Sequence, residues 1–218
     1  MSKNNKNVGI KVVPFYPNES DNLHCLQASI RSILDYFKID CDKDKVDENT
    51  GFFGTMSWLP HSVNWLSEVG LDVKLYSICE YDKLIDSGEE YLKTLKGQFF
   101  DKEKNEGQYK YLDKVIEASK QMIDKKLWIN KQMSIEELKI NLDNEKTLAI
   151  AKTIYEFLDG RAIAGNPHFV TVIKEYRPGE WLIHDPGLPG VERRKVSQII
   201  EGGVKIFGDI VLISEKSS

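Results

Sequence analysis

Three side chains in this sequence have the chemistry needed to activate a thiol: Cys25, His168 and Asp185. A thiol attacks a carbonyl group as the thiolate, and the unpaired N–H groups at a helix N-terminus stabilise that anion. An imidazole within hydrogen-bonding distance would take the thiol proton, and a carboxylate would fix the orientation of the ring. The set predicts a Cys-His-Asp triad that hydrolyses a peptide or amide bond through a thioester acyl-enzyme.

The residues after Cys25 predict the helix that would position it. Apolar side chains recur there at helical spacing and give one buried face, formed by Leu26, Ile30, Ile33, Leu34 and Phe37. Asp21 or Asn22 is the expected cap of this helix, because both side chains can accept a hydrogen bond from its first turn. Cys25 is therefore expected in the first turn.

His168 and Asp185 flank a predicted hairpin. His168 stands before a strand over 169–175, Asp185 follows a strand over 180–184, and the Tyr-Arg-Pro-Gly sequence between them is typical of a turn. Because neighbouring antiparallel strands bring their ends together, the two side chains are expected to meet. His184 should point to the opposite face and is a less suitable base. Each residue also has an ordinary structural interpretation, in a core, a loop or a turn, and only their combination indicates chemistry.

The remaining pattern predicts helices followed by a mostly antiparallel sheet. Ser57 is the expected cap, and Gly70 the end, of a second helix, and Ser134 with Glu137 matches a capping box. Helices are also expected over 81–95 and 111–123, a polar connection over 96–108, and strands over 71–78, 147–154 and 206–213. The fold class is α+β, with residues 1–218 forming a single domain.

Composition excludes several classes of protein. The 30 basic and 34 acidic residues give a net charge of −4, which offers no attraction to nucleic acid. No apolar run is long enough for membrane insertion, and the lysine-containing N-terminus has no apolar core like that of a signal peptide, so a cytoplasmic location is expected. The three cysteines lack CxxC spacing, and the cysteines and histidines lack zinc-site spacing. We expect no disulfide framework, no metal and no cofactor.

Three segments resemble the peptidase C39-like group of the papain-like cysteine peptidase superfamily, which includes bacteriocin-leader peptidases. They are HCLQASIRSILDYF, WLPHSVNWLSEVGLDVKLYS and PHFVTVIKEYRPGEWLIHDPG. The resemblance implies the papain-like fold, with Cys25, His168 and Asp185 as nucleophile, base and orienting carboxylate. It also implies that residues 81–133 are a helical insertion.

The sequence departs from that group at two positions. Leu26 follows the cysteine, where the group usually has glycine. Glu19 stands six residues before the cysteine, where the group has a glutamine that stabilises the oxyanion. A carboxylate would repel a developing oxyanion, so Asn18 or Asn22 is the expected substitute for that donor.

Three functions follow from the resemblance. The first is a thiol protease or related hydrolase of a peptide or amide substrate. The second is an acyltransferase on the same scaffold, like the butirosin-biosynthesis group, and the third is a catalytically degenerate peptide-binding module. The last two would act with a separate partner, an acyl carrier or a transporter.

Overall fold

The computed structural model describes residues 11–40, 42–53, 57–154, 167–187, 191–195 and 209–216. The helices are α1 (Cys25–Tyr36), α2 (Lys43–Asn49), α3 (Leu59–Glu68), α4 (Tyr81–Ser87), α5 (Glu89–Lys96), the 3-10 helix η1 (Gly97–Phe99), α6 (Phe100–Asn105), α7 (Leu112–Asp124) and α8 (Ile135–Leu142). The strands are β1 (Leu71–Ser77), β2 (Trp128–Asn130), β3 (Thr147–Ile154), β4 (Pro167–Arg177), β5 (Glu180–His184), β6 (Val191–Lys195) and β7 (Asp209–Glu215).

These strands form one mixed sheet in the order β2-β1-β7-β3-β4-β5-β6. The β1–β2 pair is parallel, and every other neighbouring pair among them is antiparallel. The predicted α+β class is confirmed. The sheet is not wholly C-terminal, however, because β1 pairs along its whole length with β7 near the end of the chain.

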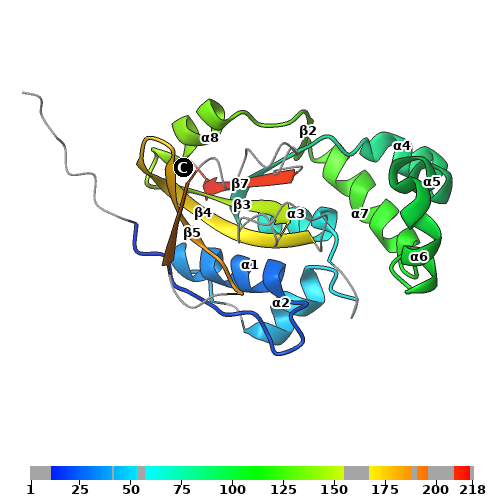
Figure 1. Cartoon of the computed structure of the whole chain (residues 1–218), viewed down its shortest axis with the longest axis horizontal. Coiled ribbons are helices and arrows are strands. Elements are labelled where there is room, and N and C mark those ends of the chain that lie inside the picture. Colours follow the sequence, from blue (N-terminus) through cyan, green and yellow to red (C-terminus); the bar gives the residue numbers. More distant parts are fainter. Residues whose placement is uncertain are drawn as a thin grey trace, which may run out of the picture.

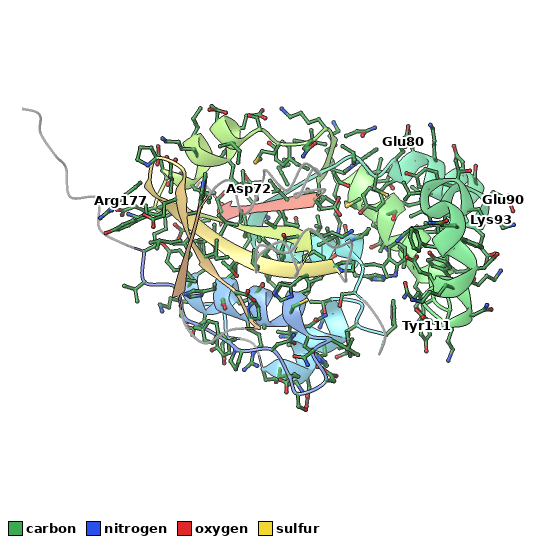
Figure 2. All side chains as sticks on the ribbon, in the orientation of Figure 1. Asp72, Glu80, Glu90, Lys93, Tyr111 and Arg177 are labelled. Atoms are coloured by element: carbon green, nitrogen blue, oxygen red, sulfur yellow. The ribbon has the colours of Figure 1, made fainter. Side chains whose placement is uncertain are left out.

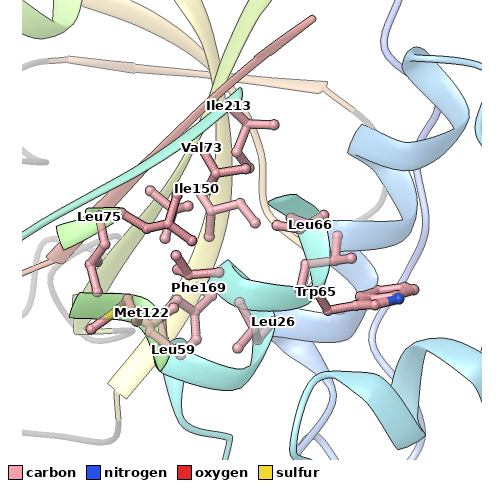
Figure 3. Packing of buried hydrophobic residues seen from close by; sticks show 14 of the residues in the cluster. Leu26, Leu59, Trp65, Leu66, Val73, Leu75, Met122, Ile150, Phe169 and Ile213 are labelled. Atoms are coloured by element: carbon pink, nitrogen blue, oxygen red, sulfur yellow. The ribbon is translucent and has the colours of Figure 1, made fainter. Parts of the chain in front are cut away.

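Apolar side chains cover both faces of the sheet. Helices α1, α3 and α7 pack on one face, and α8 packs on the other (Figure 1). Strand alternation divides the side chains between the two cores, so that Phe169 faces α1 whereas Val170 faces α8. Figure 3 shows Leu26 of α1 beside Phe169 in the larger core. The buried face of α1 therefore holds this helix against β4. Cys25 is the first residue of the helix.

Three helix predictions need correction. Residues 43–49, for which no helix was predicted, form α2, which Asp42 caps by accepting the Lys45 N–H at 2.8 Å. The expected helix over 81–95 is divided at Gly88, whose φ of 52° is left-handed. The expected connection over 96–108 contains η1 and α6. Only single apolar residues of α2 and α6 are buried, so neither helix has a clear periodic pattern.

The predicted caps have mixed outcomes. The capping box of Ser134 and Glu137 is confirmed, with both reciprocal hydrogen bonds present. The N-cap of α1 is His24, not Asp21 or Asn22, and its side chain does not cap the helix. The N-cap of α3 is Trp58, while Ser57 accepts a hydrogen bond from Gln27.

The predicted hairpin is present as β4 and β5, with Gly179 in its turn. Because β4 begins at Pro167, His168 lies inside the strand and not before it. The last strand begins at Asp209, and residues 206–208 of the predicted strand lie outside the described residues. Within the described chain, no helix is long and apolar enough to cross a membrane.

Helices α4, α5 and α6 form a lobe beyond the β1–β2 side of the sheet (Figure 1). Figure 2 shows Glu80, Glu90 and Lys93 on this lobe, far from Arg177 at the end of β4. The lobe falls within residues 81–133. That these residues are an insertion remains a prediction.

Candidate active site

The ends of β4 and β5 bring a histidine and a carboxylate together. His168 Nε2 lies 2.7 Å from Asp185 Oδ1, and the side chain of Asp185 is fully buried. The same carboxylate oxygen accepts the Gly187 N–H at 2.9 Å, which holds it in the turn after β5. The orientation of the imidazole is therefore set by a carboxylate that is itself fixed by backbone.

The thiol of Cys25 lies on the other side of this imidazole. Burial lowers the pKa of His168, but hydrogen bonds to Asp185 and to Cys25 outweigh burial and raise the pKa to about 9. Because Nε2 faces Asp185, Nδ1 is the ring nitrogen available to the thiol. Cys25 is the first residue of α1 and is 8% exposed. The hydrogen bond places the Cys25 thiol beside a ring that can take its proton.

Asn18 connects the loop before α1 to the turn after Asp185. Its Oδ1 accepts the N–H groups of Glu19 at 3.0 Å and His24 at 2.9 Å. Its own N–H donates to the Pro186 carbonyl at 2.8 Å. These contacts place the Asn18 amide at the start of α1 and orient its Nδ2 group away from the loop N–H groups.

The other two oxyanion candidates are placed differently. The carboxylate of Glu19 lies 3.6 Å from the ammonium group of Lys43 on α2. Asn22 is exposed, has a φ of 59°, and donates its N–H to the Glu19 carbonyl in a turn. Of the three candidates, only Asn18 has its side chain bonded to the residue that precedes Cys25.

Two further polar residues lie near the site without joining it. Gln27 donates to Thr50 Oγ1 at 3.0 Å and Ser57 Oγ at 2.7 Å. His184 packs edge-on against Phe15, and burial lowers its pKa. Its neighbours differ from those of Asp185, as expected for adjacent residues of a strand.

Sequence reasoning missed the contacts of His24. Its ring lies 3.0 Å from Asp21 Oδ1 and 3.5 Å from Asp47 Oδ2, and it packs against the tilted ring of Phe52. The sequence did contain a signal for the contact with Asp47. Asp42 before a run of charged residues is typical of a helix start, and Asp47 lies on the helix that begins there. Among the described residues, no group of three ligating side chains could hold a metal ion.

No protein-family model matches this chain, and no curated protein matches it. Among solved structures, it aligns with a double glycine motif protease from an AMS/PCAT transporter in complex with the leader peptide, at a TM-score of 0.50 and 15% identity over 96% of each chain. It also aligns with the peptidase domain of Streptococcus ComA, a bi-functional ABC transporter involved in a quorum sensing pathway, at a TM-score of 0.49 and 10% identity over 93% of this chain and 98% of that one. The chain thus has the papain-like fold of C39-type peptidase domains.

Proposed function

We propose that this protein is a cysteine-dependent hydrolase of peptide or amide bonds. Cys25 is the nucleophile, His168 the general base and Asp185 the carboxylate that orients the imidazole. The observation that carries the proposal is the continuous set of hydrogen bonds from Asp185 through His168 to Cys25. Burying such groups costs free energy that an apolar core avoids, and perturbed, paired groups of this kind are concentrated at functional sites.

In the first half-reaction, the Cys25 thiolate attacks the carbonyl carbon of the scissile amide and a C–S bond forms. The imidazolium of His168 then donates its proton to the leaving nitrogen as the C–N bond breaks. In the second, a water molecule gives a proton to His168 while its oxygen attacks the thioester carbon. The C–S bond breaks, the acid product is released, and the Cys25 thiolate is regenerated.

The oxyanion of each tetrahedral intermediate needs hydrogen-bond donors at the start of α1. The N–H of Cys25 is one, because the first residues of a helix have no intrahelical acceptor. We assign the second to Asn18 Nδ2, since the Asn18 amide is held beside this turn by the His24 N–H. The pairing of Glu19 with Lys43 reduces the repulsion that a carboxylate in this loop would exert on the oxyanion.

The solved double-glycine protease indicates the first substrate to try. Peptides with a double-glycine motif should be cleaved by the wild-type protein, and mass spectrometry should detect an acyl-enzyme on Cys25. Cys25→Ala should abolish both signals, and Cys79→Ala is the matched control. Burial raises the pKa of the Cys79 thiol to about 11, so loss of that thiol should leave turnover unchanged.

Two other outcomes would replace the proposal. Peptide binding without cleavage, equal in wild type and Cys25→Ala, would indicate a peptide-binding module. Release of the acyl group only when an amine is present would indicate an acyltransferase. The solved double-glycine protease comes from a transporter, so a separate transporter is the partner to test by co-purification.

A further inference from the structure

His24, directly before the nucleophile, is enclosed by two carboxylates and an aromatic ring. Its Nδ1 lies 3.0 Å from Asp21 Oδ1 in the preceding loop, and its Nε2 lies 3.5 Å from Asp47 Oδ2 on α2. Its ring packs against Phe52 at a centroid distance of 4.1 Å, with the two ring planes tilted by 39°. His24 itself is 8% exposed, whereas the side chains of Asp21 and Asp47 are 45% and 22% exposed.

Both ring nitrogens of an imidazole can take part in hydrogen bonds. A neutral ring has one N–H and can donate to only one of the two carboxylates, whereas an imidazolium donates to both. Charged donors also make stronger hydrogen bonds than neutral ones. The ring of His24 lies between the two carboxylates and therefore links the loop before α1 to α2 with one side chain.

The backbone of His24 transmits this position to the nucleophile. Its N–H donates to Asn18 Oδ1 at 2.9 Å, and its carbonyl accepts the Ala28 N–H at 2.9 Å in the first turn of α1. The peptide unit that joins His24 to Cys25 carries the N–H assigned above to the oxyanion. A shift of the His24 ring would move that N–H and the thiol together.

The segment that contacts the His24 ring, residues 47–53, makes further contacts of its own. After Asp47, the chain supplies Thr50, which accepts a hydrogen bond from Gln27 on the next part of α1. A Cβ atom added at Gly51 would lie 2.6 Å from the His61 ring, so the turn packs too closely there for a side chain. Residues 47–53 thus support the start of α1 at two points.

We propose that His24 is a positioning residue that holds the Cys25 thiol and the Cys25 N–H in place by linking Asp21 to Asp47 of α2. The proposal rests on the proposed function, because it assigns the role through Cys25. It assigns no contact between His24 and the substrate.

The test measures the alkylation rate of Cys25 by iodoacetamide at pH 7, with the labelled residues identified by mass spectrometry. His24→Leu and Asp47→Ala should each slow labelling roughly tenfold or more, the scale expected when a reacting group is misplaced. The double variant should be no slower than either single variant, because both break the same link. His24→Gln, which retains one amide donor group, should recover part of the rate. Asp44→Ala removes an exposed aspartate from the same helix α2 and should label like the wild type.

Wild-type labelling of His24→Leu or additive losses in the double variant would overturn the positioning role alone. Slow labelling of the wild-type Cys25, equal to that of an ordinary thiol, would overturn the proposed triad together with it. Asp47→Ala decides the question if His24→Leu does not fold, since Asp47 is partly exposed and its loss leaves the imidazole in place.

Discussion

The α4–α6 lobe and the candidate active site use charged side chains differently. In the lobe, two exposed pairs join residues of one helix or of neighbouring helices: Lys93 and Glu90 at 2.9 Å within α5, and Lys104 and Glu89 at 2.5 Å between α6 and α5. At the site, His168 and Asp185 are buried and come from two strands, and their third partner, Cys25, comes from the first helix.

The two regions differ in the free-energy cost that remains when one member of a charged pair is removed. An exposed side chain regains water, so a surface pair contributes little to stability. A buried carboxylate left alone retains the cost of its desolvation. Substitutions should therefore be tolerated in the lobe and costly at the site.

The largest effect is expected for Asp185→Ala. Removing this carboxylate leaves the buried imidazole without its main partner, and loss of one member of a buried pair costs about 3–5 kcal/mol of unfolding free energy. Urea denaturation would measure the loss, and Cys25 alkylation should slow in parallel. Asp72→Ala, an exposed aspartate on β1 (Figure 2), is the control and should change neither. Equal effects of the two variants would contradict the contrast drawn above.

The second effect is a pH dependence of stability. The pKa of His168 is raised from 6.5 to about 9, so between these values the folded state binds more protons than the unfolded state. The stabilisation is fully present below pH 6.5 and is lost as the pH rises through 9; its upper bound is on the order of 3 kcal/mol. Denaturation of wild type and His168→Gln at several pH values would measure it. A difference between them that stayed constant across this range would exclude the linkage.

A smaller effect is expected at the start of α8, where the interactions are local. Ser134→Ala removes the side chain that accepts the Glu137 N–H, and loss of such a cap costs about 1 kcal/mol. Thermal unfolding followed by circular dichroism would detect it, and Cys25 alkylation should be unchanged. Ser87→Ala, at an exposed position of α4, serves as the matched substitution.

The smallest effect is expected in the lobe itself. Lys93→Ala breaks the exposed pair with Glu90 and should leave the melting temperature unchanged within experimental error. A loss comparable to that of Ser134→Ala would mean that the lobe pairs act as a network.

Much of the fold was predictable because it depends on local patterns. The apolar spacing after Cys25 predicts α1, and the turn residues between 175 and 180 predict the hairpin. Helix α2 was not predicted because it buries only Val46 and so lacks an apolar face. Strand β2 was not predicted because it has three residues and depends on parallel pairing with β1, which no local pattern encodes.

The sequence by itself determined which residues could perform thiol chemistry and which elements carry Cys25, His168 and Asp185, because periodicity and turn chemistry act over a few neighbouring residues. Tertiary structure decided the distances among those side chains. It also decided the placement of Asn18 at the start of α1, the pairing of Glu19 with Lys43, and the link from His24 to Asp47. These contacts join segments whose approach depends on how α1 packs against α2 and against the sheet, and no short-range pattern specifies that packing.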